Sequence, residues 1–224
     1  MTPHPWSYSA LSMFATCPAQ YQAVKVLKTA ADTMGEDAKF GVYLHKQFEL
    51  RQRDGTALPA DLAHHEPVMQ QLENFPGEKF LELRVALDKS MQTSEFFARS
   101  VWSRGVLDYL AIEGDTAIII DYKTGKRVPS TDQLALCSLV VFAKYPDVQQ
   151  CKVWYYMTRK MADDQPSWHT FSRADIPELW GRFIPNLKQY VDAYRTDTWQ
   201  ARPSGLCRGW CPVKQCDHWQ PKRA

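Results

Sequence analysis

The stretch GVLDYLAIEGDTAIIIDYKTG, from Gly105 to Gly125, decides the fold. It contains two strand-like apolar runs that are joined by the turn signal EGD, a pattern typical of a β-hairpin. Asp108 lies in the first run and Asp121 ends the second, so the hairpin is expected to bring both carboxylates to the same end of a sheet. Lys123 follows Asp121 by two residues, and side chains two apart on a strand point to the same face.

Two carboxylates and an ammonium group in one pocket suit the hydrolysis of a phosphodiester. Carboxylates bind Mg²⁺ or Mn²⁺, which polarises the phosphate and lowers the pKa of a bound water, while the lysine orients that water or stabilises developing charge. Three isoleucines before Asp121 predict a buried strand, where an ionised carboxylate is costly unless a cation pairs with it. A surface turn with an ordinary salt bridge is the alternative interpretation of this fragment.

Outward from the hairpin, the sequence predicts an α/β fold with a central mixed sheet flanked by helices. Apolar periodicity indicates further strands at 78–87 and 149–160, and helices near 7–17, 40–55, 67–72, 132–146 and 176–197. Ser7 or Ser9 is expected to cap the first helix, and Gly55 to end the second. We expect one domain over 1–224, with N-terminal helices in 1–75, the catalytic sheet and helices in 76–195, and a tail in 196–224.

Composition and net charge indicate a globular protein but do not indicate its function. The chain of 224 residues is 45% hydrophobic and 23% charged with a net charge of +2, which is ordinary for a globular protein and too small to indicate nucleic-acid binding alone. No run approaches the roughly 18 apolar residues of a membrane helix, and the start lacks a signal peptide, so we expect a cytoplasmic protein. Local basic groups occur in 202–223 and at Lys123, Lys126 and Arg127.

The cysteines are distributed unevenly. Three of the six, Cys207, Cys211 and Cys216, fall within ten residues near the end, and Cys17 lies near the start. Because disulfides are disfavoured in a reducing cytoplasm, this set indicates metal ligands. Four thiolates, or three with His218, would also complete a tetrahedral Zn²⁺ site, and unliganded thiols are a third interpretation. The remaining two cysteines are expected to pack in the core.

Six motifs in order resemble the PD-(D/E)XK nuclease superfamily, in particular its RecB-like branch, which includes AddB-type domains, CRISPR adaptation nucleases and phage-type exonucleases. The motifs span nearly the whole chain: SYSALSMFATCPAQY, GVYLH, RGVLDYL, IIDYKTGK, QLAL and the terminal cysteines. The resemblance implies a restriction-endonuclease-like fold and Mg²⁺- or Mn²⁺-dependent cleavage of DNA. The place of a tyrosine in the family's glutamine helix is occupied here by Cys137, which is a departure from the pattern.

Residue roles follow from the resemblance. It implies that His45, Asp108, Asp121 and the carbonyl of Tyr122 bind the metal ion, that Lys123 is the catalytic lysine, and that Gln133 orients water or substrate. It also implies a catalytic role for Glu82, although Glu78 lies close enough to be confused with it.

The resemblance further implies an iron–sulfur site that joins the two ends of the chain. In this branch one N-terminal and three C-terminal thiolates hold a [4Fe-4S] cluster, here Cys17, Cys207, Cys211 and Cys216. Their spacing, C-x3-C-x4-C, differs from the family's usual spacing, so structural Zn²⁺ stays an alternative.

The function expected from these patterns is that of a metal-dependent deoxyribonuclease. We expect an exonuclease on single-stranded or end-exposed DNA, acting in recombination, repair or phage DNA metabolism in the cytoplasm of a bacterial or phage-infected cell. The alternatives are a recombination accessory module that binds DNA without cleaving it, and an unrelated cysteine-ligated metalloprotein. Other recombination or replication proteins are expected partners.

Overall fold

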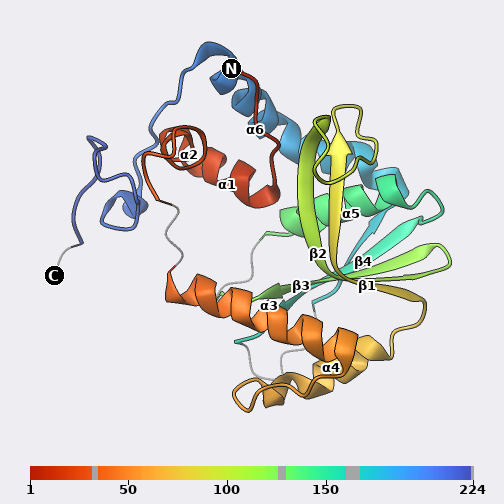
Figure 1. The fold of residues 1–224 in the computed structure, drawn as a ribbon. Coiled ribbons are helices and arrows are strands. Elements are labelled where there is room, and N and C mark those ends of the chain that lie inside the picture. The colour runs from red at the N-terminus through yellow and green to blue at the C-terminus, as the bar shows by residue number, and fades with distance from the viewer. Residues whose placement is uncertain (32–34, 126–129, 160–166, 223–224) are drawn as a thin grey trace. The chain divides into compact units, whose positions relative to one another are not determined.

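Five strands form one mixed sheet in the order β1-β2-β3-β4-β5 (Figure 1). The computed structural model describes residues 1–31, 35–125, 130–159 and 167–222. β1, β2 and β3 are antiparallel, β3 and β4 run parallel, and β5 is antiparallel to β4. The strands are β1 (Glu78–Asp88), β2 (Val101–Glu113), β3 (Thr116–Lys123), β4 (Gln150–Met157) and β5 (His169–Ser172). The expected mixed sheet is confirmed, and β5 adds an edge strand that the sequence pattern does not predict.

The hairpin between β2 and β3 is present as predicted. Glu113 pairs with Thr116, so Gly114 and Asp115 form a two-residue connection. Gly114 adopts a φ of +56°, a left-handed conformation that glycine reaches without steric cost. The chain then crosses through α5 (Asp132–Lys144) to β4, which pairs in parallel with β3.

Helices cover both faces of the sheet: α3 and α4 lie on one face and α5 on the other (Figure 1). The helices before the sheet are α3 (Glu36–Asp54), the 3₁₀ turn η2 (Ala63–His65) and α4 (Glu66–Glu73). Leu44 and Phe48 of α3 are fully buried against apolar residues of the sheet. Gly55, with a φ of +68°, ends α3 as predicted. A Cβ on Gly41 would lie 3.3 Å from Thr124 Oγ1, so glycine allows α3 to approach the end of β3 closely.

The described residues group into two compact units. One comprises Gly35–Trp180 and contains the sheet; the other comprises Met1–Met34 together with Gly181–Ala224. The long helix α6 (Ile176–Thr196), which follows the 3₁₀ turn η3 (Arg173–Asp175), runs across this boundary and contains Pro185 as expected. The prediction of one nuclease domain over the whole chain stays a prediction.

The unit that contains both chain ends has an aromatic core. Its other helical elements are α1 (Tyr8–Thr16), α2 (Pro18–Tyr21), the π-helix η1 (Gln22–Val26) and the 3₁₀ turn η4 (Gly205–Cys207). The Ser7 side chain accepts a hydrogen bond from the backbone of Ala10, so Ser7 is the cap of α1. Tyr21 bonds to the hydroxyls of Tyr190 at 2.8 Å and Tyr194 at 3.1 Å, which ties the N-terminal helices to α6 within this unit.

No helix in the described part of the chain has the length and apolar character needed to cross a membrane. The basic residues Lys126, Arg127 and Arg223 lie outside the described residues.

Candidate active site

Three predicted residues, His45, Glu82 and Asp108, converge at one end of the sheet. Each offers a ligand atom, and these atoms all lie within 4.8 Å of one another. His45 Nδ1 is 3.4 Å from Asp108 Oδ1 and 3.7 Å from Glu82 Oε1. One residue comes from α3, one from β1 and one from β2, so the packing of α3 on the sheet creates the group. An imidazole and two carboxylates form a donor set that can hold a divalent cation.

The two carboxylates change the protonation of the imidazole. Burial on its own lowers the pKa of His45, but hydrogen bonding and the charges of Asp108 and Glu82 raise it from 6.5 to about 10. His45 is therefore an imidazolium at neutral pH when it is the sole cation facing the two acids. A bound cation would take over this role, and His45 would then bind it as a neutral ligand.

Glu82 reaches this group from an unusual backbone. Its φ is +49°, although it is not glycine, and it has no partner in the register between β1 and β2. A left-handed residue within a strand costs free energy, and such strain concentrates at functional sites. Glu78 lies four residues earlier, opposite Ile112 and exposed, so Glu82 is the acid that meets His45.

Asp108 also fixes the main chain of β3. Its Oδ2 accepts a hydrogen bond of 2.8 Å from the backbone N–H of Tyr122, and its side chain is only 10% exposed. The carbonyl of the same residue, Tyr122, lies 3.2 Å from His45 Nε2. The carbonyl that was predicted as a metal ligand therefore faces the predicted metal-binding imidazole.

Asp121, Lys123 and Gln133 form a second, adjoining group. Gln133 donates to Asp121 Oδ1 at 2.6 Å and accepts from Lys123 Nζ at 2.9 Å. Lys123 Nζ lies 2.5 Å from Asp121 Oδ2. Asp121 and Lys123 lie two residues apart on β3 and Gln133 lies in the first turn of α5, so the crossover helix supplies the amide that holds the acid and the lysine together.

Asp121 is a buried acid that lies beside a lysine. It is 4% exposed, and its Oδ2 is ion-paired with the ammonium of Lys123. Burial, followed by the charge of Asp108, raises the pKa of Asp121 above its usual value, while Lys123 and His45 lower it in part. A buried carboxylate beside a second acid fits a cation ligand.

One further residue borders this group and is missed by sequence reasoning. Tyr155 of β4 pairs with Asp121 in the sheet register, and Lys123 Nζ lies 5.5 Å from the centre of its ring. Tyr155 could be found only by knowing that β3 pairs in parallel with β4, and local sequence patterns do not reveal which strands pair.

Cys137 lies one turn after Gln133 on α5. Burial, and then the charges of Asp121 and Asp108, raise the pKa of its thiol. Cys151 is fully buried, as predicted.

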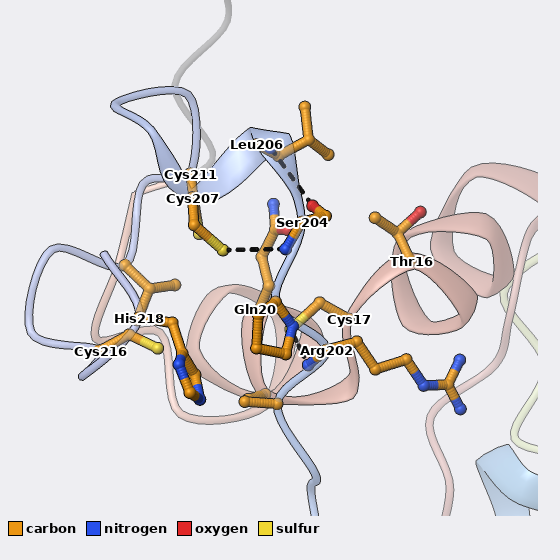
Figure 2. Close-up of a pocket in the computed structure, with 14 residues that line it drawn as sticks. Thr16, Cys17, Gln20, Arg202, Ser204, Leu206, Cys207, Cys211, Cys216 and His218 are labelled. Atoms are coloured by element: carbon orange, nitrogen blue, oxygen red, sulfur yellow. Dashed lines mark hydrogen bonds between the residues drawn. The ribbon is translucent and has the colours of Figure 1, made fainter. Parts of the chain in front are cut away.

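The four remaining cysteines line one pocket in the unit that contains the chain ends (Figure 2). Cys17 follows α1, and the other three come from the C-terminal tail. The backbone N–H of Arg202 donates to Cys17 Sγ at 3.4 Å, and that of Ser204 donates to Cys207 Sγ at 3.5 Å. Cys211 and Cys216 pack beside Val213, and His218 completes the lining of the pocket.

The thiols share this pocket without forming a tight ligand group. Among the described residues, the group around His45 is the one whose ligand atoms lie within 4.8 Å of one another. A tetrahedral zinc site with bonds of about 2.3 Å would bring its sulfurs to roughly 3.8 Å from each other. The pocket therefore collects the predicted cysteines but does not have the spacing of a preformed zinc site.

Comparison with solved structures finds similar chains. A solved structure from Eubacterium rectale described as a "Putative exonuclease" is similar in fold, with a TM-score of 0.55 and 13% identity over 95% of this chain and 86% of that one. The structure of SSO0001 has a TM-score of 0.43 and 13% identity over 97% of this chain and 88% of that one. A search of the curated proteins gives no match.

A family model is more decisive than these structural similarities. The model described as the PD-(D/E)XK nuclease superfamily matches residues 5–216. That range contains the mixed sheet, the group around His45 and the pair Asp121 and Lys123, whose spacing is the D-x-K of the superfamily name. The chain belongs to the PD-(D/E)XK nuclease superfamily.

Proposed function

We propose that this protein is a metal-dependent deoxyribonuclease that hydrolyses phosphodiester bonds with Mg²⁺ or Mn²⁺. The observation that carries the proposal is the adjacency of two groups, the potential ligands around His45 and the buried pair Asp121 and Lys123. They adjoin because Asp108 and His45 both contact the backbone of Tyr122, which lies between Asp121 and Lys123. Family membership implies the same chemistry. A structural salt bridge alone would not account for a second acid and a histidine beside it.

The residues fit a hard divalent cation. We assign Asp108 and Asp121 as its main ligands, with Glu82, His45 and the carbonyl of Tyr122 as further donors. Support comes from the burial of Asp121 beside the charge of Asp108 and from the convergence of Glu82 and Asp108 on His45. When bound, the ion supplies polarisation of the phosphate and a water of lowered pKa.

The chain's own groups then position the reactants. Lys123 presents an ammonium to the attacking water or to a phosphate oxygen, where it offsets the charge that develops. Gln133 holds Lys123 and Asp121 in their mutual geometry through its two hydrogen bonds, and is a positioning residue in this scheme. Glu82 and Asp108 hold the imidazole of His45 over the same end of the sheet.

We further propose that the enzyme acts as an exonuclease on single-stranded or end-exposed DNA. The fold similarity to the Eubacterium rectale protein motivates this choice. A role in recombination, repair or phage DNA metabolism in a bacterial or phage-infected cell follows from the resemblance to the RecB-like branch. The competing function is an accessory module that binds DNA without cleaving it.

Cleavage assays separate these possibilities. Purified protein is incubated with end-labelled linear and with circular single-stranded DNA, in Mg²⁺, Mn²⁺ or EDTA. We expect metal-dependent degradation of the linear strand, no cleavage of the circle, and loss of activity in Lys123→Met. Lys152→Met, the same change at an exposed position of β4, is the matched control and should retain activity. Cleavage of the circle would overturn the exonuclease assignment, and an inert wild type that binds DNA would favour the accessory module.

For the cysteine pocket we propose a [4Fe-4S] cluster held by Cys17, Cys207, Cys211 and Cys216. Support comes from the four thiols in one pocket and from the backbone N–H groups that point at two of the sulfurs, a feature that stabilises thiolates. A cubane cluster also holds its thiolates further apart than one zinc ion does. Such a cluster would hold together the unit that contains both chain ends.

Metal analysis tests the cluster against the zinc alternative. Protein purified without oxygen should contain about four irons and four sulfides per chain, with broad visible absorption that bleaches on reduction. Cys17→Ser should lose most of this iron, while Cys151→Ser, a buried cysteine away from the pocket, should keep it. Stoichiometric zinc without iron or sulfide would establish the zinc site instead.

A further inference from the structure

The hairpin of β1 and β2 extends past the rest of the sheet (Figure 1). β3 pairs with β2 only from Tyr109 to Glu113, whereas β1 pairs with β2 as far as Val101. Residues 84–88 and 101–106 therefore form a two-stranded ribbon that continues outward from the candidate metal site. A ribbon without a third full strand exposes side chains that a central strand would bury.

One face of this ribbon continues the surface that carries Asp108. Arg104, Val106 and Asp108 are spaced two residues apart along β2, so their side chains point to the same face. Arg84 lies opposite Val106 in the register, so it joins them from β1. Arg84 and Arg104 are exposed, and Val106 is 40% exposed. At 3.3 Å per residue, Arg104 lies about 13 Å along the strand from the metal-site acid.

The connection between the two strands folds back onto this ribbon. Thr93 bridges to Leu87, and the backbone of Ser94 donates to the carbonyl of Ala86 at 2.9 Å. This return places Phe96 and Phe97 beside the arginines. The loop is thus attached to β1 by main-chain contacts.

Arginine and phenylalanine side chains interleave there. The guanidinium carbon of Arg84 lies 5.7 Å from the ring centre of Phe96 and 5.8 Å from that of Phe97, and Arg104 lies 5.5 Å from Phe96. The two rings meet edge to face at 5.0 Å. Phe97 is 74% exposed, more than any other large apolar side chain in the described ranges. We call Arg84, Phe96, Phe97 and Arg104 the ribbon face.

Charge on the ribbon face is uncompensated. Within the described residues, neither Arg84 nor Arg104 has a carboxylate within 4.0 Å, whereas Arg51 and Arg53 of α3 each pair with two acids. The nearby carboxylate of Asp88 accepts from two backbone N–H groups of its own turn. The guanidinium groups are therefore available to an anionic partner.

We propose that the ribbon face binds single-stranded DNA on the path to the metal site. Unpaired bases stack on exposed aromatic rings, and arginines bind the phosphates between them, whereas a duplex hides the faces of its bases. Phe97 is the stacking platform, and Arg84 and Arg104 contact the backbone. This assignment rests on the proposed nuclease function and specifies its substrate as a strand with unpaired bases.

Binding of a fluorescent twelve-nucleotide single strand, followed by anisotropy in Ca²⁺ with cleavage monitored on gels, tests the assignment. Phe97→Ala should weaken binding about 5- to 150-fold, the range of one base–aromatic stack, while Phe97→Tyr should bind like wild type. Trp168→Ala, an exposed aromatic residue beside the opposite edge strand, is the control and should have no effect. Affinity for a blunt duplex should be the same in all these variants.

The arginines are tested through salt dependence. The slope of log affinity against log salt for the single strand should become shallower by about 0.7 for each of Arg84→Gln and Arg104→Gln. Arg53→Gln removes an equal but ion-paired charge and should leave the slope unchanged. Thermal melting should show that the variants are folded, as expected for exposed side chains.

The outcomes separate this assignment from the proposed function. If wild type cleaves DNA and the ribbon variants bind and cleave like wild type, the ribbon face is not the DNA path and the nuclease assignment stands. If wild type binds a single strand through Phe97 but cleaves nothing, the binding face stands and hydrolysis is rejected. If Phe97→Ala weakens duplex and single-strand binding equally, the preference for unpaired bases is wrong.

Discussion

Asp108 of β2 accepts a hydrogen bond from the backbone N–H of Tyr122 in β3 at 2.8 Å, so one proposed metal ligand also holds the neighbouring strand. The strands no longer pair directly at this point, since the last register pair is Tyr109 with Ile120. The carboxylate therefore has a structural and a chemical task, and two substitutions should separate them.

Asp108→Asn and Asp108→Ala are expected to be equally inactive but unequally stable. Asparagine retains an oxygen for the N–H of Tyr122, whereas alanine leaves that buried N–H without an acceptor, at a cost of about 1–3 kcal/mol. Both should lose at least about 100-fold in activity because a ligand charge is missing. Denaturant unfolding and cleavage of labelled DNA measure the two effects. Equal stability of the variants would contradict the structural task.

Gln133→Ala should reduce kcat by about 10- to 100-fold with little change in KM. The amide holds Lys123 and Asp121 in place without itself supplying charge to the substrate, so ground-state binding should persist. Steady-state kinetics on a short single strand measure both constants. A change in KM alone would assign Gln133 to substrate binding instead.

Divalent cations should stabilise the protein against heat. A cation that binds the converging acids of the folded protein and not the unfolded chain stabilises the fold, and a ligand at 100 times its Kd adds about 2.7 kcal/mol. Thermal melting with increasing Mn²⁺ should raise the Tm of wild type and have a much smaller effect on Glu82→Gln. Glu95→Gln, an exposed acid outside this site, should respond like wild type. An equal response in all three proteins would place the metal elsewhere.

Stability should fall as the pH decreases from about 6.5 to about 4 because of His65. Burial, with a smaller contribution from His64, lowers the pKa of His65 to about 4, and its Nδ1 lies 2.7 Å from the hydroxyl of Tyr156. Below pH 6.5 the unfolded chain takes up a proton that the folded chain does not, which costs up to about 1.4 kcal/mol per pH unit until pH 4.

His65→Gln removes this contribution. The difference in unfolding free energy between wild type and His65→Gln should vary with pH only inside that window. Substitution of the exposed His169 serves as the control. A constant difference from pH 7 to pH 4 would show that folding does not lower the pKa of His65.

Local patterns predicted much of the fold and the positions of Asp108, Asp121 and Lys123, while the resemblance pointed to the other candidate site residues. The hairpin, α3 ending at Gly55 and the acids on β2 and β3 follow from alternation, turn residues and strand length, which are properties of short segments. β5 has four residues, too few for a periodic signal. Tyr155 beside Lys123 depends on which strands pair across the crossover, and the strained backbone of Glu82 depends on its surroundings. Such features arise from tertiary packing.

The left-handed backbone at Glu82 has a consequence for how this protein would respond to directed evolution. Glycine would adopt that conformation without penalty, and asparagine at a small one, whereas the main chain disfavours the glutamate that occupies this position. Thermal stability and the proposed binding of a cation by Glu82 would therefore favour different residues at this position. In a library selected only for stability at high temperature, glycine is expected to replace Glu82 early, and the selected variants are expected to lose activity.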